Sequence, residues 1–181
     1  RTPLSKSVVY TATHCNLIHE LGMVKSIGGI CELQYIKVPE IIEGCRKGTI
    51  VNAGEGTNPD IEKIIDLHPD ALLLSPYENS GGHGQVEKLK VPIIECADYM
   101  ETSALGSAEW IRFYGLLFHQ SAKADSIFAI VEKNYNELKG QVDFHAVTAE
   151  FFFSKTGKVQ HLLHQLKYEG NKDAGFFLGQ Q

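Results

Sequence analysis

Several polar and aromatic side chains follow the apolar runs of this sequence, where a parallel α/β sheet would end its strands. Such groups exchange hydrogen bonds and stack on flat molecules, which is typical of a small-molecule pocket. In an open sheet of this kind, ligands bind outside the carboxyl ends of the strands. We therefore predict a ligand-binding cleft rim formed by Thr13, His14, Glu32, Tyr35, Glu55, Thr57, Tyr77, Asn79, His83 and Tyr99.

A metal site is an alternative interpretation of the same residues. His14, His83 and a carboxylate from Glu32 or Glu55 could supply nitrogen and oxygen ligands. However, no pair among the eight histidines shows the i, i+4 spacing of an HExxH helix. His68 lies in a His-Pro-Asp turn at the opposite end of a strand, and we assign it a structural role. We predict no bound metal.

Catalytic arrangements are weakly supported. Ser75 and Cys15 follow apolar runs, but the sequence contains no G-x-S-x-G elbow. Adjacent side chains of an extended loop point apart, so His14 is badly placed to activate Cys15. The glycine-rich stretches 54–56 and 80–84 lack the spacing of a phosphate loop, and we interpret both as loops. We predict no catalytic residue and no enzyme activity.

The four cysteines, Cys15, Cys31, Cys45 and Cys96, show no C-x-x-C spacing. This argues against a tetrahedral metal site and against a redox motif. We expect free, buried thiols, as is common for cysteines at strand ends. One disulfide between Cys15 and Cys31 is the alternative, because both follow neighbouring strands.

Alternating strands and helices must position the rim. We expect strands at 8–11, 26–30, 50–52, 71–74 and 92–96 and helices at 16–21, 39–46, 59–67, 86–89, 106–118 and 122–139. This alternation predicts a doubly wound, mainly parallel sheet of the α/β class with helices on both faces. Gly22 is expected to end the first helix.

Residues 58–75 are the most informative stretch. Asn58 is a suitable N-cap, and Pro59 suits a first helical position because that position needs no N–H. An apolar stripe at helical spacing follows, formed by Ile61, Ile64, Ile65 and Leu67. The apolar run 71–74 then predicts a strand covered on both faces.

The expected helix at 122–139 is the longest, at about 27 Å. Its apolar stripe consists of Ala124, Ile127, Phe128, Val131, Tyr135 and Leu138. The pattern is compatible with a rigid strut between two lobes and equally with an ordinary amphipathic surface helix.

Size and charge set limits on the function. The 181 residues are 43% hydrophobic, enough for one globular domain with a core. The net charge of −5 argues against nucleic-acid binding. No segment approaches the ~20 apolar residues of a membrane helix.

Residues 58–75 contain the motif Asn-(x)2-Ile-Glu-(x)5-His-Pro-Asp-Ala-Leu-Leu-Leu. This motif resembles one found in the substrate-binding proteins of ABC importers for iron–siderophore, haem and vitamin B12. Segments similar to other parts of that family occur in the family's order at 7–14, 21–30, 92–96, 108–115, 122–124 and 135–138. The resemblance covers about residues 7–139. It implies a non-enzymatic protein that captures an iron chelate, haem or cobalamin without a covalent cofactor and delivers it to a membrane permease.

The resemblance also implies an organisation and a location. Residues 1–121 would form an N-terminal ligand-binding lobe, 122–139 the helix between lobes, and 140–181 the start of a truncated or altered second lobe. Within this last part we expect a strand at 146–153 and a turn at 171–175, whereas 159–167 departs from the family's aromatic-glycine stretch.

Glu62 matches the glutamate with which that family docks on its permease, although an acid in a first helical turn also has a purely local explanation. The protein would lie in the periplasm or at the cell surface, tethered by a lipid anchor outside these residues. The alternatives are an importer protein that binds zinc or manganese directly, or an enzyme subunit that handles a metal cofactor on a similar domain.

Overall fold

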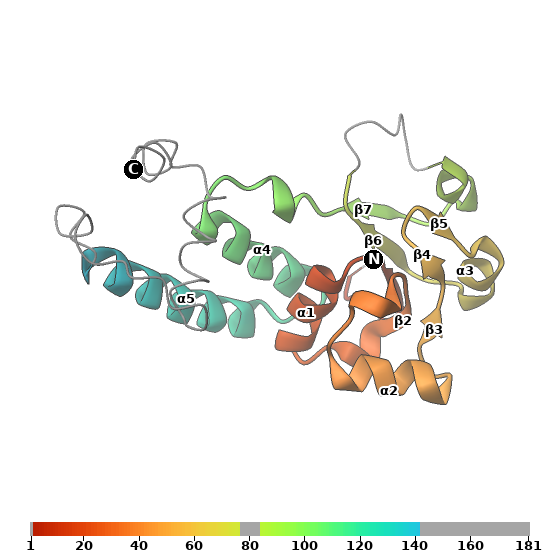
Figure 1. Ribbon diagram of the computed structural model, residues 1–181, viewed down its shortest axis with the longest axis horizontal. Helices are drawn as coiled ribbons and strands as arrows, with labels where there is room; N and C mark the ends of the chain where they lie inside the picture. The colour runs from red at the N-terminus through yellow and green to blue at the C-terminus, as the bar shows by residue number, and fades with distance from the viewer. Residues whose placement is uncertain (1, 77–83, 142–181) are drawn as a thin grey trace, which may run out of the picture.

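The centre of the protein is a five-stranded parallel sheet (Figure 1), seen in a computed structural model that describes residues 2–76 and 84–141. The strands lie in the order β3-β2-β1-β6-β7, and every neighbouring pair is parallel. Their bounds are Ser7–Val9 for β1, Ile27–Ile30 for β2, Val51–Asn52 for β3, Ala71–Leu74 for β6 and Ile93–Glu95 for β7. The predicted α/β class and all five parallel strands are confirmed.

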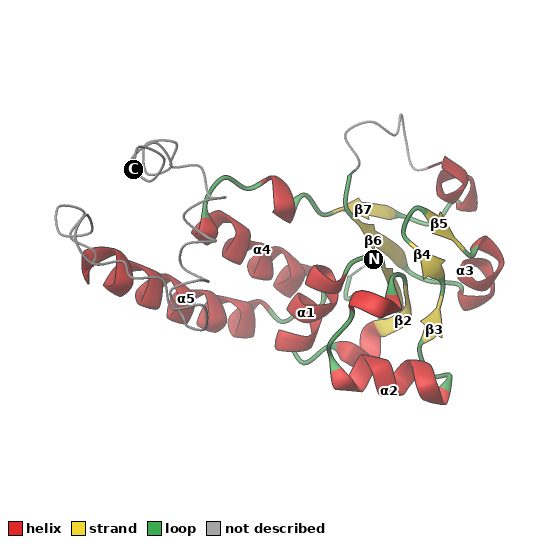
Figure 2. Ribbon diagram, in the orientation of Figure 1, coloured by secondary structure: helices red, strands yellow, loops and turns green. Residues whose placement is uncertain are grey.

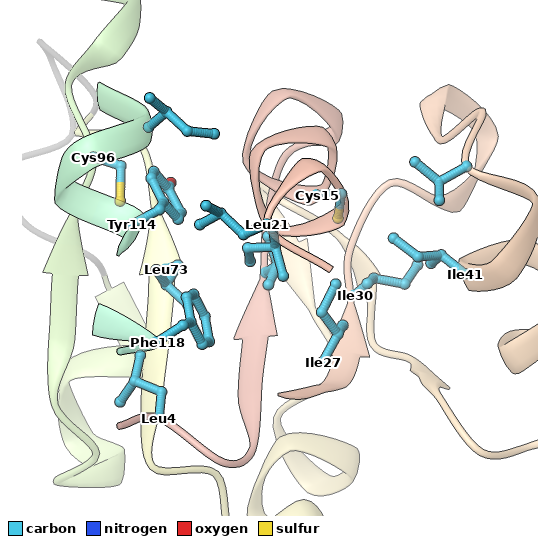
Figure 3. Close-up of a cluster of buried hydrophobic side chains, with 14 of the residues drawn as sticks. Leu4, Cys15, Leu21, Ile27, Ile30, Ile41, Leu73, Cys96, Tyr114 and Phe118 are labelled. Carbon is cyan, nitrogen blue, oxygen red and sulfur yellow. The ribbon is translucent and has the colours of Figure 1, made fainter. Parts of the chain in front are cut away.

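Two apolar clusters pack against the two faces of this sheet. Because side chains alternate along a strand, Val8 belongs to one cluster and Val9 to the other. Figure 3 shows the larger cluster, in which Leu73 of β6 lies beside Phe118. The central strands β1 and β6 are buried along their whole length, as expected for a sheet covered on both faces.

Five α-helices accompany the sheet in the described part of the chain (Figure 2), and four of them contribute side chains to the larger cluster. They are α1 (Ala12–Glu20), α2 (Pro39–Lys47), α3 (Ile61–Leu67), α4 (Ala104–Leu117) and α5 (Ser121–Gln141), with short 3-10 helices at η1 (Val24–Ser26), η2 (Leu33–Tyr35), η3 (Gly84–Leu89) and η4 (Asp98–Met100). Helix α3 and η3 contribute to the smaller cluster on the opposite face. The predicted 86–89 helix is thus a 3-10 helix.

Helix α1 begins four residues before its predicted start at residue 16. Thr11 caps it: the Thr11 hydroxyl accepts a hydrogen bond from the backbone N–H of His14 at 3.3 Å. The segment after β1 is therefore helical rather than an extended loop. The predicted end is confirmed, since Gly22 has a left-handed φ of 75° just beyond the C-cap.

The predicted start of α3 is wrong. Asn58 and Pro59 form strand β5 (Asn58–Pro59), which pairs antiparallel with β4 (Gly54–Glu55) in a small hairpin. Asp60 is the N-cap instead, accepting a hydrogen bond from the N–H of Lys63 at 3.2 Å. The hairpin depends on Gly54, whose φ of 91° is accessible to glycine and strained for other residues.

Only part of the predicted α3 stripe is buried. Ile64 is fully enclosed, whereas Ile65 is 50% exposed, because this seven-residue helix touches the sheet along a narrow line. The helix ends at His68, whose φ of 49° makes it a left-handed cap. The structural role predicted for His68 is confirmed.

Helices α4 and α5 form a tight antiparallel pair. A Cβ on Gly115 would lie only 2.6 Å from the Cβ of Ala124, so the backbones approach closely at that point. The guanidinium of Arg112 lies 4.2 Å from the ring centre of Phe128 and pairs with Asp125 at 2.9 Å. These contacts fix the direction of α5 relative to α4.

Helix α5 is longer than predicted, and only its first half is covered by the described part of the chain. Ala124 and Phe128 are buried, but Val131 is exposed and Leu138 is 56% exposed. The predicted apolar stripe is therefore buried as far as Phe128, and its residues beyond that point are not fully covered within the described part of the chain. Figure 1 shows the second half of α5 projecting away from the sheet. The expected strand at 146–153 and turn at 171–175 lie outside the described residues.

All four cysteines are free, so the alternative of a Cys15–Cys31 disulfide is wrong. Cys15, Cys31 and Cys96 are buried among apolar side chains, and Cys45 is half-buried in α2. The expected free thiols are confirmed.

Candidate ligand-binding rim

The carboxyl ends of the five strands meet at one edge of the sheet, as they must in a parallel arrangement. We call the segments that follow these ends the rim; its described parts are 10–16, 31–36, 53–59, 75–76 and 96–103. The predicted rim residues Tyr77, Asn79 and His83 lie outside the described residues.

Hydrogen bonds join neighbouring rim segments. The N–H of Glu32, after β2, donates to the carbonyl of Gly54, after β3, at 2.8 Å. The hydroxyl of Tyr99, after β7, donates to the carbonyl of Pro76, after β6. These bonds make the two halves of the rim semi-rigid, which favours a preformed binding surface.

His14 lies beneath the rim rather than on it. The predicted position at the rim surface is wrong, because the earlier start of α1 turns the side chain inward and leaves it 1% exposed. Its Nε2 lies 2.8 Å from Oδ1 of the buried Asp98, and its ring lies 5.9 Å from that of Tyr114. Asp98, which sequence reasoning missed, thereby connects the segment after β7 to α1.

The other predicted rim residues in the described part of the chain reach the surface. Glu32 is half-buried, while Thr13, Glu55 and Thr57 are exposed. Tyr35 is 63% exposed and Tyr99 53% exposed, unusual values for large aromatic side chains. Met100, beside Tyr99, is similarly exposed and was not predicted, since a single methionine gives no sequence signal.

The β4–β5 hairpin carries two of these residues. Glu55 is the second residue of β4, and Thr57 lies in the turn that joins β4 to β5. The backbone N–H of Asp60 donates to the carbonyl of Ala53 at 2.7 Å and closes the hairpin against the end of β3. The predicted loop at 54–56 is thus an ordered turn that holds Glu55 at the rim.

The thiols near the rim are protonated and poorly reactive at neutral pH. Burial raises the pKa of Cys15 and Cys31 to about 12 and that of Cys96 to about 11. A thiol with so high a pKa holds its proton at neutral pH, and the thiolate is the reactive form. These cysteines therefore lack the character of a catalytic nucleophile.

The metal alternative draws no support from the described residues. Within 2–76 and 84–141, no three side chains of His, Cys, Asp or Glu gather in a manner that could hold an ion. Nε2 of His14 already lies 2.8 Å from Oδ1 of Asp98. His83, the other proposed ligand, is outside the described part.

An open hollow of about 370 Å³ adjoins the rim along α4. Its lining includes Trp110 and Phe113, whose rings meet edge to face with centroids 5.4 Å apart. Glu101 accepts a hydrogen bond from Nε1 of Trp110 at 2.9 Å and links the hollow to the rim. The hollow is shallow and lies beside the strand ends rather than over them.

Glu62 lies in the first turn of α3 and is exposed, as predicted. Helix α3 starts just after the β4–β5 hairpin, so Glu62 stands near the rim without being part of it. In the described part of the chain, no helix combines the length and the apolar character needed to cross a membrane.

The geometry agrees with a comparison to known families. A model described as periplasmic binding protein matches residues 8–156, most of the chain. The chain belongs to this family. Membership identifies a binding protein rather than an enzyme, as the sequence predicted.

Individual proteins resemble the chain at low sequence identity. The chain is similar to an uncharacterized lipoprotein of Methanocaldococcus jannaschii, with 24% identity over 139 residues that cover 73% of this chain and 34% of the relative. It is also similar to the crystal structure of the iron uptake ABC transporter substrate-binding protein PiuA from Streptococcus pneumoniae, with 24% identity and a TM-score of 0.58 over 77% of this chain and 48% of that one.

The periplasmic haem binding protein HutB of Vibrio cholerae is a third example, with 16% identity and a TM-score of 0.60 over 75% of this chain and 49% of that one. Solved structures of siderophore-binding and vitamin B12-binding proteins also share the fold. The chain thus spans about half the length of these structures and a third of the lipoprotein.

Proposed function

We propose that this protein is the substrate-binding component of an ABC importer, and that its rim captures an iron chelate, haem or a corrinoid for delivery to a membrane permease. One observation carries the proposal: Tyr35 and Tyr99 are exposed at the carboxyl ends of a parallel sheet in a periplasmic binding protein. Exposed aromatic groups beside polar ones suit a large, partly flat ligand.

The proposed organisation has two lobes. We assign 1–121 to the ligand-binding lobe, 122–139 to the connecting helix and 140–181 to the start of a second lobe. The exposed apolar residues Val131 and Leu138 on the projecting half of α5 support this assignment, because such a face is costly to leave in water. The second lobe would supply the opposite wall of the cleft.

Glu62 is the proposed contact with the permease. Its carboxylate is exposed on a helix anchored by the buried Ile64, so its position is rigid. A fixed carboxylate suits paired hydrogen bonds from an arginine of the partner. A location in the periplasm or at the cell surface, with a lipid anchor, is supported by the family and by the lipoprotein relative.

A binding screen tests the proposal. The full-length protein is titrated with ferrichrome, hemin and cyanocobalamin and followed by the fluorescence of Trp110 and the tyrosines, with calorimetry for the strongly absorbing ligands. We expect saturable binding of at least one chelate, with a Kd of about 1 μM or below. An absence of heat and of fluorescence change with every chelate would contradict the proposed function.

A further inference from the structure

We infer that the rim selects a neutral or cationic chelate with an apolar surface, and that it discriminates against polyanionic chelates. This inference rests on the proposed function and concerns the ligand class for the same rim. Three features carry it: the sign of the rim charges, the partners of those charges, and the exposed aromatic groups.

The charges of the rim are all negative. In its described parts, 10–16, 31–36, 53–59, 75–76 and 96–103, the ionisable acids are Glu32, Glu55, Asp98 and Glu101, and these segments contain neither lysine nor arginine. An anionic ligand would therefore meet like charge on this wall of the cleft. Because the net charge of the chain is also −5, its overall field offers no compensation.

The nearby positive groups are engaged elsewhere or lie past the rim. Nζ of Lys63 pairs with Asp60 at 3.1 Å and donates to the carbonyl of Asn52 at 3.3 Å. The imidazole of His14 is buried against Asp98, which removes that carboxylate from the surface as well. Lys37 lies just beyond η2, outside the rim segments.

Glu32 and Glu55 have no ion-pair partner among the described residues. They are neighbours, because the N–H of Glu32 donates to the carbonyl of Gly54, the residue before Glu55. Tyr35 lies in the same turn, with its N–H donating to the carbonyl of Glu32 at 2.9 Å. One end of the rim thus presents, beside an exposed aromatic ring, two carboxylates that form no ion pair with the described residues.

The opposite end of the rim repeats this combination. Tyr99 and Met100 are both 53% exposed, and Glu101 follows them directly. Large apolar side chains gain free energy when a ligand covers them, and a tyrosine ring also attracts a cation. Thr13, between these ends, carries no charge. Together the two ends favour a ligand with apolar surface and no negative charge.

A comparison of the affinities for chelates of different charge tests the inference. The full-length protein is titrated with cationic ferrioxamine B, neutral ferrichrome and cyanocobalamin, and anionic ferric enterobactin and hemin, by fluorescence and calorimetry. We expect the tightest cationic or neutral chelate to bind at least about tenfold more tightly than either anionic one, a difference of ~1.4 kcal/mol.

Charge reversal at the rim provides the second arm. The double variant E32K/E55K should lose roughly tenfold in affinity for a cationic chelate and gain affinity for ferric enterobactin, with both effects reduced at high salt. The control is the double variant E20K/D66K, which makes the same charge change at exposed residues in the last turns of α1 and α3, away from the rim, and should leave all affinities unchanged.

The possible outcomes distinguish a failure of the charge inference from a failure of the proposed function. Tightest binding of ferric enterobactin or hemin, or equal effects of E32K/E55K and E20K/D66K, would overturn the charge inference while leaving the proposed function intact. Binding of none of the five chelates would overturn the proposed function, and this inference with it.

Discussion

Nε2 of His14 lies 2.8 Å from Oδ1 of Asp98, and both side chains are buried. The pair joins the first turn of α1 to the segment after β7, two parts of the chain that are 84 residues apart. Thr13 and Tyr99, the immediate neighbours of the pair, are exposed at the rim. The buried pair therefore fixes the positions of two groups of the proposed ligand-binding rim.

Breaking this pair should destabilise the fold. His14→Ala leaves the Asp98 carboxylate buried without its partner, and we expect a loss of about 3–5 kcal/mol in the free energy of unfolding. Urea denaturation measures it. The matched control is Glu40→Ala, which removes the more exposed 2.9 Å contact with Nδ1 of His19 and should cost under about 1 kcal/mol. Similar losses in both variants would contradict the role assigned to the buried pair.

Much of the architecture was predictable because it depends on local patterns. The apolar run 71–74 is bounded by turn residues and is a strand with the predicted ends. The position of His14 was not predictable in the same way. A helix can begin at Thr11 or several residues later, and the choice depends on a capping bond and on Asp98, which is distant in sequence. The inward direction of His14 follows from that choice.

Two competing caps explain the error at α3. Asn58-Pro59 and Asp60 are both plausible helix starts, and the sequence alone does not rank them. The hairpin decides in favour of Asp60, because Asn58 and Pro59 pair with β4. Similarly, the periodicity of α5 identifies a face that can be buried but does not reveal where a covering element stops, so the exposure of Leu138 could not be foreseen.

The close approach of α4 and α5 yields a second prediction. In Gly115→Ala, the new Cβ would lie 2.6 Å from Ala124, so the helices must separate. We expect a loss of about 1–3 kcal/mol from overpacking, reduced by the ~1 kcal/mol that alanine gains over glycine within a helix. Thermal unfolding of Gly115→Ala, of Ala124→Gly and of the double variant Gly115→Ala/Ala124→Gly measures the coupling. A double variant no more stable than the sum of the single changes would contradict steric overlap as the cause.

The free energy of unfolding should decrease as the pH rises above 9. Burial raises the pKa of the Cys15 and Cys31 thiols from 9.0 to about 12 in the folded state. Below pH 9 both states hold these protons and the stabilisation is complete. Above pH 9 the unfolded state loses protons that the folded state retains, so the free energy of unfolding decreases progressively toward pH 12. Burial also raises the pKa of Tyr114, which adds to the same trend at higher pH.

Urea denaturation between pH 8 and pH 10.5 checks this prediction. In Cys15→Ala one of the titrating groups is absent, so its stability should decline less steeply with pH, whatever its absolute value. The half-buried Cys45 provides the control, since its pKa is raised less and Cys45→Ala should change the slope less. Parallel pH profiles for Cys15→Ala and the unmodified protein would contradict the burial effect.

The last prediction separates permease docking from ligand binding. Glu62 is exposed in the first turn of α3, outside the rim segments, so changing it should leave chelate affinity intact. Glu62→Arg would place a cation against the proposed arginine of the permease, and like-charge contact can cost several kcal/mol. Glu62→Ala removes only the attraction, so it should impair uptake less than Glu62→Arg does.

Uptake by cells that carry the full importer, measured beside ligand binding in solution, distinguishes the possibilities. Asp66→Arg is the matched control, because it makes the same charge change at another exposed position of the same helix. Normal uptake with Glu62→Arg would remove the docking role, and reduced chelate affinity would assign Glu62 to the pocket instead. If the contact with the permease is confined to the start of α3, Glu62→Arg should impair uptake and Asp66→Arg should not. Neither variant should change the affinity for the chelate.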